Sequence, residues 1–172
     1  MPSQKNFLAY FSHIPSLVVI LGLGGLIPFV GLCLLIIFYS EVWYAFWLSC
    51  LLQYGAVILS FVGALQWGVV QKRNIHQKTF SLRLIWGVMP ALIAWMSFQF
   101  PVWTGLRIQA FTFMLCYCFE RFTDRVDSQD PLALDTLHNQ SEENREWMTN
   151  WMTLRLVLTT VASFSLLMAS YY

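Results

Sequence analysis

Residues 53–70 read QYGAVILSFVGALQWGVV and contain no charged side chain. A stretch of this length and hydrophobicity fits the hydrocarbon core of a bilayer. Small residues recur in it at every fourth position, and steps of four keep to one side of a helix. This small-residue strip consists of Ala56, Ser60, Ala64 and Gly68. In lipid, such a smooth side lets a second helix approach closely and gain dispersion contacts. The segment is therefore predicted to be the centre of a helix bundle, with its packing residues at Gly55, Ala56, Ser60, Ala64 and Gly68.

The composition of the whole chain indicates a lipid environment. Of 172 residues, 58% are hydrophobic and only 11% are charged, whereas an ordinary soluble domain is about 25% charged. The apolar residues come in long blocks rather than at amphipathic spacing. The net charge of +1 gives no field that would attract nucleic acid. We expect an all-α integral membrane protein with a single membrane domain.

The apolar blocks predict five transmembrane helices. The first is too long for a signal peptide and has no cleavage site of small residues. Pro28 and the glycines before it predict a kink near Gly24, which a neighbouring helix must cover in lipid. Pro90 predicts a second kink, in the third span. The expected spans are residues 14–38, 45–70, 82–100, 103–119 and 151–172.

The one hydrophilic connection covers residues 120–150 and is rich in acidic side chains. A segment of this length usually has a role or local structure of its own. Asn139 and Glu142 resemble a helix-capping pair. We therefore expect an acidic cytoplasmic loop with a short surface helix from about Ser141, running into the fifth span.

The basic residues predict the orientation in the membrane. With five spans, nine of the ten lysines and arginines fall on one side, and only Arg107 falls on the other. The positive-inside rule then places the N-terminus in the cytoplasm and the C-terminus outside. The chain has no basic, serine-rich presequence, which favours a bacterial inner membrane. The mitochondrial inner membrane is the alternative.

A few polar or amphipathic residues interrupt the apolar blocks. The amides of Gln53 and Gln66 need partners in lipid, either across helices or at the headgroups. Arg107 is expected to extend its guanidinium to the headgroups, the alternative being a buried functional arginine. Trp67 and Arg155 are candidate lipid contacts, and Arg155 lies where the last helix enters the membrane.

No motif predicts a catalytic, cofactor-binding or metal site. The chain contains no phosphate-binding loop, no HExxH and no glycine-rich dinucleotide fingerprint. Its four cysteines lie in or beside apolar blocks without metal-ligand spacing, and its histidines are isolated from one another. We therefore expect no cofactor, no metal and no enzymatic activity.

Three stretches resemble one protein family. They are residues 53–70, where tyrosine-glycine-alanine at 54–56 and tryptophan-glycine at 67–68 flank an apolar core, the LGLGGLIPF stretch at 21–29, and WMTLRLVLTTV at 151–161. Together they are similar to the DUF3429 family of transmembrane protein 69-like, small multi-pass membrane proteins. Gln66 departs from the histidine that the family pattern has before tryptophan-glycine. Because an amide does not titrate, this departure disfavours proton transfer or metal binding there.

Three functions compete. The first is a non-catalytic accessory, assembly or scaffolding factor that acts by helix packing, and its partners are the lipid bilayer and a membrane protein or a second copy of the chain. The second is a small solute or ion transporter or channel, which the kinked helices and the scattered polar groups support. An intramembrane enzyme ranks last, because no nucleophile and base are paired. We adopt the first.

Overall fold

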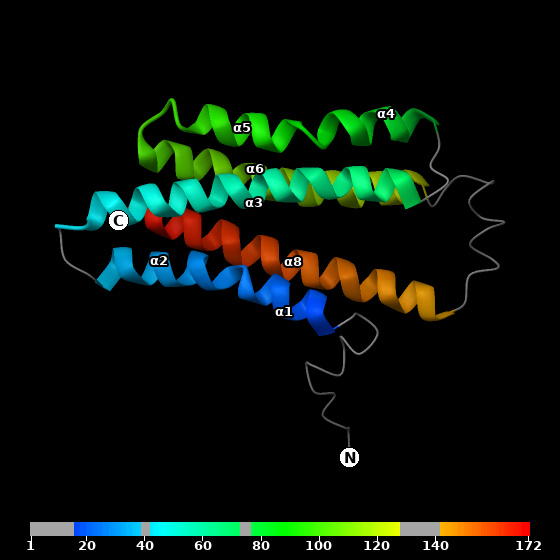
Figure 1. Cartoon of the computed structure of the whole chain (residues 1–172), viewed down its shortest axis with the longest axis horizontal. Helices are drawn as coiled ribbons and strands as arrows, with labels where there is room; N and C mark the ends of the chain where they lie inside the picture. Colours follow the sequence, from blue (N-terminus) through cyan, green and yellow to red (C-terminus); the bar gives the residue numbers. More distant parts are fainter. Residues whose placement is uncertain (1–15, 39–41, 73–76, 128–141) are drawn as a thin grey trace, which may run out of the picture.

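The computed structural model describes residues 16–38, 42–72, 77–127 and 142–172, and these residues form helices without any strand. The helices make five spans that alternate in direction, so the start of α1 and the end of α8 lie at opposite ends of the bundle (Figure 1). The prediction of an all-α bundle with five spans is confirmed. The helices are α1 Ser16–Gly24, α2 Leu26–Phe38, α3 Tyr44–Lys72, α4 Gln77–Trp86, α5 Met89–Ser97, α6 Val102–Asp127 and α8 Glu142–Tyr171.

Four of the five spans are long and apolar enough to cross a membrane by themselves. They cover Leu17–Phe38, Tyr44–Val70, Thr79–Ser97 and Asn150–Tyr171. The remaining span, α6, buries polar side chains among its apolar ones, namely Gln109, Thr112, Glu120 and Thr123. In lipid these groups need partners on other helices. The polar face of α6 therefore makes this helix dependent on its neighbours.

The first span is broken at Gly25, between α1 and α2. Pro28 lacks the amide hydrogen that would continue the helical bonding at this point. The hydroxyl of Tyr54, on α3, donates a hydrogen bond of 2.8 Å to the carbonyl of Gly25. The predicted kink and its cover by a neighbouring helix are both confirmed.

The third span is broken at residues 87–88, just before Pro90 in the first turn of α5. At this break the backbone of Gly87 lies against Gly63 of α3. A methyl group on Gly63 would come within 2.5 Å of the Gly87 carbonyl oxygen. The indole of Trp67 caps the same break, because its Nε1 donates to the carbonyl of Leu84 at 3.1 Å.

Helix α3 packs on every other span of the bundle, but the small-residue strip is not its packing side. Ser60, Ala64 and Gly68 are exposed, Ala56 is half-buried, and a Cβ on Gly68 would meet nothing within 4 Å. The buried side contains Gly55, Leu59, Gly63 and Gln66. Within the monomer, Ser60, Ala64 and Gly68 therefore do not pack against other helices, whereas Gly55 is buried and Ala56 packs against the core.

Two helices extend beyond their predicted ends. Helix α6 continues from the expected end at residue 119 to Asp127, because Glu120 and Thr123 face the interior. Helix α8 begins at Glu142 and includes the expected surface helix in one continuous element with the fifth span. The loop expected at 120–150 is thus shorter, and residues 128–141 lie outside the described part of the chain.

Candidate functional site

The Arg83 cluster, formed by Arg83, Gln66, Thr79, Asp124 and Asp127, lies between α3, α4 and α6. Arg83 is fully buried, and its guanidinium donates to Asp124 at 3.0 Å, Asp127 at 2.8 Å and Gln66 at 3.0 Å. The Thr79 hydroxyl donates to the other oxygen of Asp127 at 2.8 Å. A buried charge is tolerated when it is paired and hydrogen-bonded, so this cluster ties three helices together.

A second ion pair joins α6 to α8. Both Nε and Nη2 of Arg155 donate to the same oxygen of Glu120, at 3.0 and 2.7 Å. The two side chains are no more than 9% exposed. Arg155 was predicted to be an anchoring or lipid-contact residue at the membrane entry. The structure instead places most of its guanidinium inside the bundle, because Glu120 belongs to the helix and not to a loop.

A third polar contact lies deeper, around Gln109 of α6. Its Nε2 donates to the backbone carbonyl of Leu52 and to the hydroxyl of Ser97, both at 3.0 Å. Gly55 lies directly against its Oε1. The amide therefore links α3, α5 and α6 at one level of the bundle.

The sequence-predicted polar residues are dispersed. Arg107 reaches the end of α8, where its Nε donates to the Ser170 hydroxyl at 3.2 Å and its guanidinium lies 4.8 Å from the ring centroid of Tyr171. Gln66 belongs to the Arg83 cluster, and Trp67 caps the α4–α5 break. Gln53 is exposed. The structure therefore brings none of Gln53, Arg107 and Arg155 together.

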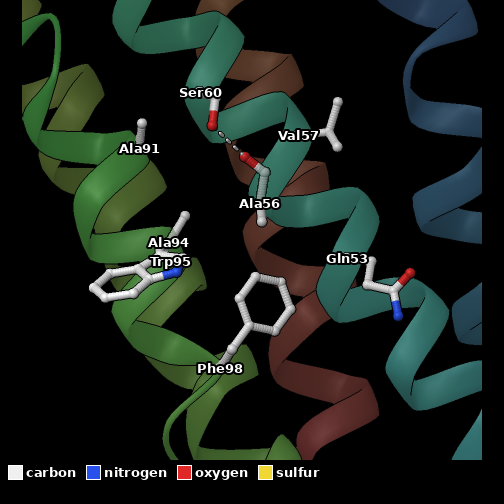
Figure 2. Close-up of a pocket in the computed structure, with 8 residues that line it drawn as sticks. All are labelled: Gln53, Ala56, Val57, Ser60, Ala91, Ala94, Trp95 and Phe98. Carbon is white, nitrogen blue, oxygen red and sulfur yellow. Dashed lines mark hydrogen bonds between the residues drawn. The ribbon is translucent and has the colours of Figure 1, made fainter.

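An open groove of about 330 Å³ runs along the outside of α3 and α5. Small side chains, Ala56, Ser60, Ala91 and Ala94, form its floor, and Phe98 extends beside Ala56 (Figure 2). The Ser60 hydroxyl is bonded to the Ala56 carbonyl of its own helix at 2.9 Å. Gln53 also lines the groove, but its amide points away from α5 (Figure 2), and it has no hydrogen-bond partner among the described residues.

The described residues contain no group of three metal-ligating side chains. The four cysteines are free thiols, and Cys33 and Cys116 are buried. The three histidines of the chain, His13, His76 and His138, lie outside the described residues.

Sequence reasoning missed Glu120, Asp124 and Asp127 because it ended the fourth helix before them. Their spacing of four and three residues places them on one helical face. An arginine seven residues before Pro90 in the third span supplied the opposite charge. Both signals are present in the sequence, and once the helix is extended they predict that its acidic face pairs with arginines of other helices.

Comparison with known proteins gives two matches. Residues 14–171 match the model of the family described as "Protein of unknown function (DUF3429)". Over 90 residues, half of this chain, it is 39% identical to Transmembrane protein 69 of Xenopus tropicalis, of which it covers 34%. No solved structure matches. Because the family match includes all five spans, the chain belongs to the DUF3429 family of membrane proteins.

Proposed function

We propose that this membrane protein is a non-catalytic accessory or assembly factor that binds another membrane protein through the outer face of α3. The observation that carries the proposal is the position of Gln53. Its amide lies within the span Tyr44–Val70, is exposed, and has no partner among the described residues. An unpaired amide in lipid favours a hydrogen bond to a second helix, worth about 1 kcal/mol.

The small-residue strip supports the same face. Ser60, Ala64 and Gly68 are exposed, so the monomer leaves their smooth surface uncovered. Large side chains line much of the remaining exterior, for example Phe111 at 66% and Phe164 at 64% exposure. The strip is thus a stretch of the surface where a partner backbone could approach closely.

The internal charges support a rigid scaffold rather than a solute pathway. A pathway usually needs polar groups that line one continuous cavity across the membrane. Here Arg83 and Arg155 are each held by acids of α6, in the half of the bundle where α6 ends. These pairs hold helices to one another.

The proposed setting is a bacterial inner membrane with the N-terminus in the cytoplasm. The described basic residues other than Arg107 lie toward the end of the bundle where α3 ends and α4 begins. The positive-inside rule makes that end cytoplasmic.

A double variant, Ala64→Leu with Gly68→Leu, tests the proposal. Ala56 is left unchanged because it is half-buried and packs against the core. Both altered residues are exposed, so the variant should keep its thermal stability in detergent while a membrane-protein partner that co-purifies with the native chain is lost. The matched control changes two exposed residues elsewhere, Phe111→Leu and Phe164→Leu, and should retain the partner. A native chain that purifies alone and moves a solute across liposomes would contradict the proposal.

A further inference from the structure

A second cavity, of about 130 Å³, lies on the opposite side of the bundle from the groove, between the kinked first span and helices α3, α6 and α8. Its walls are almost entirely apolar and include Gly22, Gly25, Ile58, Phe113 and Leu158. The absence of side chains on the two glycines, at the break between α1 and α2, makes room for it. The kink therefore creates a hollow in the lipid-embedded part of the protein.

Two polar groups of α8, one turn apart, line this apolar cavity. Arg155 is 7% exposed and uses Nε and Nη2 to bind Glu120. Its Nη1 has no hydrogen-bond partner among the described residues, and neither has the hydroxyl of Thr159. The adjacent Thr160 differs, because its hydroxyl is bonded to the Leu156 carbonyl at 2.9 Å. Arg155 and Thr159 thus line the cavity, and each has a donor without a hydrogen-bond partner among the described residues.

The bilayer is the medium next to this cavity. Leu21 and Phe61 line it and are 66% and 61% exposed, so they mark the side that opens to the exterior. Arg155 is five residues inside the span Asn150–Tyr171, which is about 7.5 Å along a helix. That depth is close to the polar part of the lipids, whereas the apolar wall continues toward the middle of the membrane.

From this arrangement we infer that the cavity binds an amphiphile: an anionic oxygen head that accepts hydrogen bonds from Nη1 of Arg155 and from Thr159, and an acyl chain that lies along the apolar wall. Glu120 holds the guanidinium in place and leaves one charge-assisted donor free. The volume equals about four water molecules at about 30 Å³ each. It therefore holds the head and the first carbons, and the rest of the chain continues through the open side.

Two sources share this chemistry, an anionic phospholipid of the bilayer and a free fatty acid. Native mass spectrometry of the full chain, released from nanodiscs of phosphatidylglycerol or phosphatidylcholine or from detergent with palmitate, separates them. We expect retention of phosphatidylglycerol or palmitate above phosphatidylcholine. Retention of the phospholipid identifies a bilayer lipid as the occupant, and retention of palmitate alone identifies a fatty acid.

The test variant is Thr159→Val, which removes one hydroxyl at nearly constant volume, and its matched control is Thr160→Val. The first should reduce retention about threefold to tenfold, as the loss of one hydrogen bond implies, and the second should leave it unchanged. Thr159→Phe, which fills the cavity, should abolish retention. A double variant, Arg155→Gln with Glu120→Gln, leaves no buried charge unpaired and should remove the preference for anionic heads.

Equal retention of phosphatidylglycerol and phosphatidylcholine, insensitive to Thr159→Val and Thr159→Phe, would overturn the inference and leave only annular lipid. A variant that fails to fold is recognised by its altered elution in detergent. In that case the effect of Thr159→Val on lipid retention, compared with Thr160→Val, tests the inference. The proposed function uses the other face of α3, so either proposal can fail while the other stands.

Discussion

Gly55 of α3 lies against Oε1 of Gln109 of α6, so closely that a Cβ at residue 55 would overlap this oxygen. The Nε2 of the same amide holds Leu52 and Ser97, which fixes the direction of the amide plane. Oε1 has no conventional hydrogen-bond partner among the described residues. The Cα hydrogen of the glycine faces it and supplies a weak contact. Glycine at residue 55 is therefore part of the polar contact at the bundle centre.

Replacing Gly55 with alanine should lower the stability of the bundle by about 1–3 kcal/mol, because the methyl group displaces Gln109 from its partners. The measurement is the temperature at which half of the protein no longer elutes as a single species in detergent. Gly68→Ala is the control, since a Cβ there meets nothing within 4 Å, and it should be neutral or slightly stabilising. Equal effects of the two changes would contradict the packing described.

Arg83→Gln should destabilise the protein strongly, by about 3–5 kcal/mol, because it leaves two acidic side chains without their buried cation. The control is Arg121→Gln, at an exposed position of the same half of the bundle. Thermal unfolding in detergent, followed by tryptophan fluorescence, should separate the two variants clearly. A wild-type midpoint for Arg83→Gln would show that the cluster does not hold the helices.

The Arg155–Glu120 pair predicts that a double change is milder than either single change. Arg155→Leu buries an unpaired carboxylate, with a cost of about 3–5 kcal/mol. Arg155→Leu combined with Glu120→Leu removes both charges and should recover most of the stability. A double-mutant cycle on unfolding midpoints measures this coupling. Additive losses would mean that the two side chains do not interact in the membrane.

Tyr54→Phe removes the hydroxyl that covers the Gly25 carbonyl at the first kink. The ring can still pack on Phe29, whose centroid lies 5.0 Å away, so only the hydrogen bond is lost. We expect a loss of about 1 kcal/mol, together with faster hydrogen exchange at the start of α2. Exchange at the start of α5 serves as the internal reference and should not change.

The proposed orientation can be measured by labelling. A chain whose native cysteines are replaced by alanine receives a single cysteine at residue 2 or residue 172. A membrane-impermeant maleimide added to intact cells should label residue 172 and leave residue 2 unlabelled until the cells are opened. Labelling of residue 2 from outside would reverse the orientation.

The number of spans and the two kinks could be predicted from the sequence, because they depend on features that act locally. Apolar length sets whether a helix crosses, and Pro28 and Pro90 each remove a backbone donor wherever they occur. The sequence also predicted that a neighbouring helix covers the first kink, because lipid cannot form a hydrogen bond with a free backbone carbonyl.

The packing face of α3 could not be predicted in this way. Small residues occur on two sides of the helix, and among its described glycines those at 55 and 63 meet side-chain or backbone atoms of other helices, whereas Gly68 meets nothing within 4 Å. Which side turns inward depends on Gln109 and Gly87, which are distant in sequence. The acidic partners of Arg83 could not be predicted either, because they lie on the part of α6 beyond residue 119, where the predicted helix had ended.

The polar inner face of α6 affects any topology diagram of this chain that is based on hydropathy alone. Four of the spans qualify by apolar length, and a diagram with four crossings returns the chain to the compartment in which it started. Because that count omits α6, the number of crossings changes from odd to even, and the diagram would place the end of α8 in the wrong compartment. The acidic side chains near the end of this helix are paired with Arg83 and Arg155 inside the bundle.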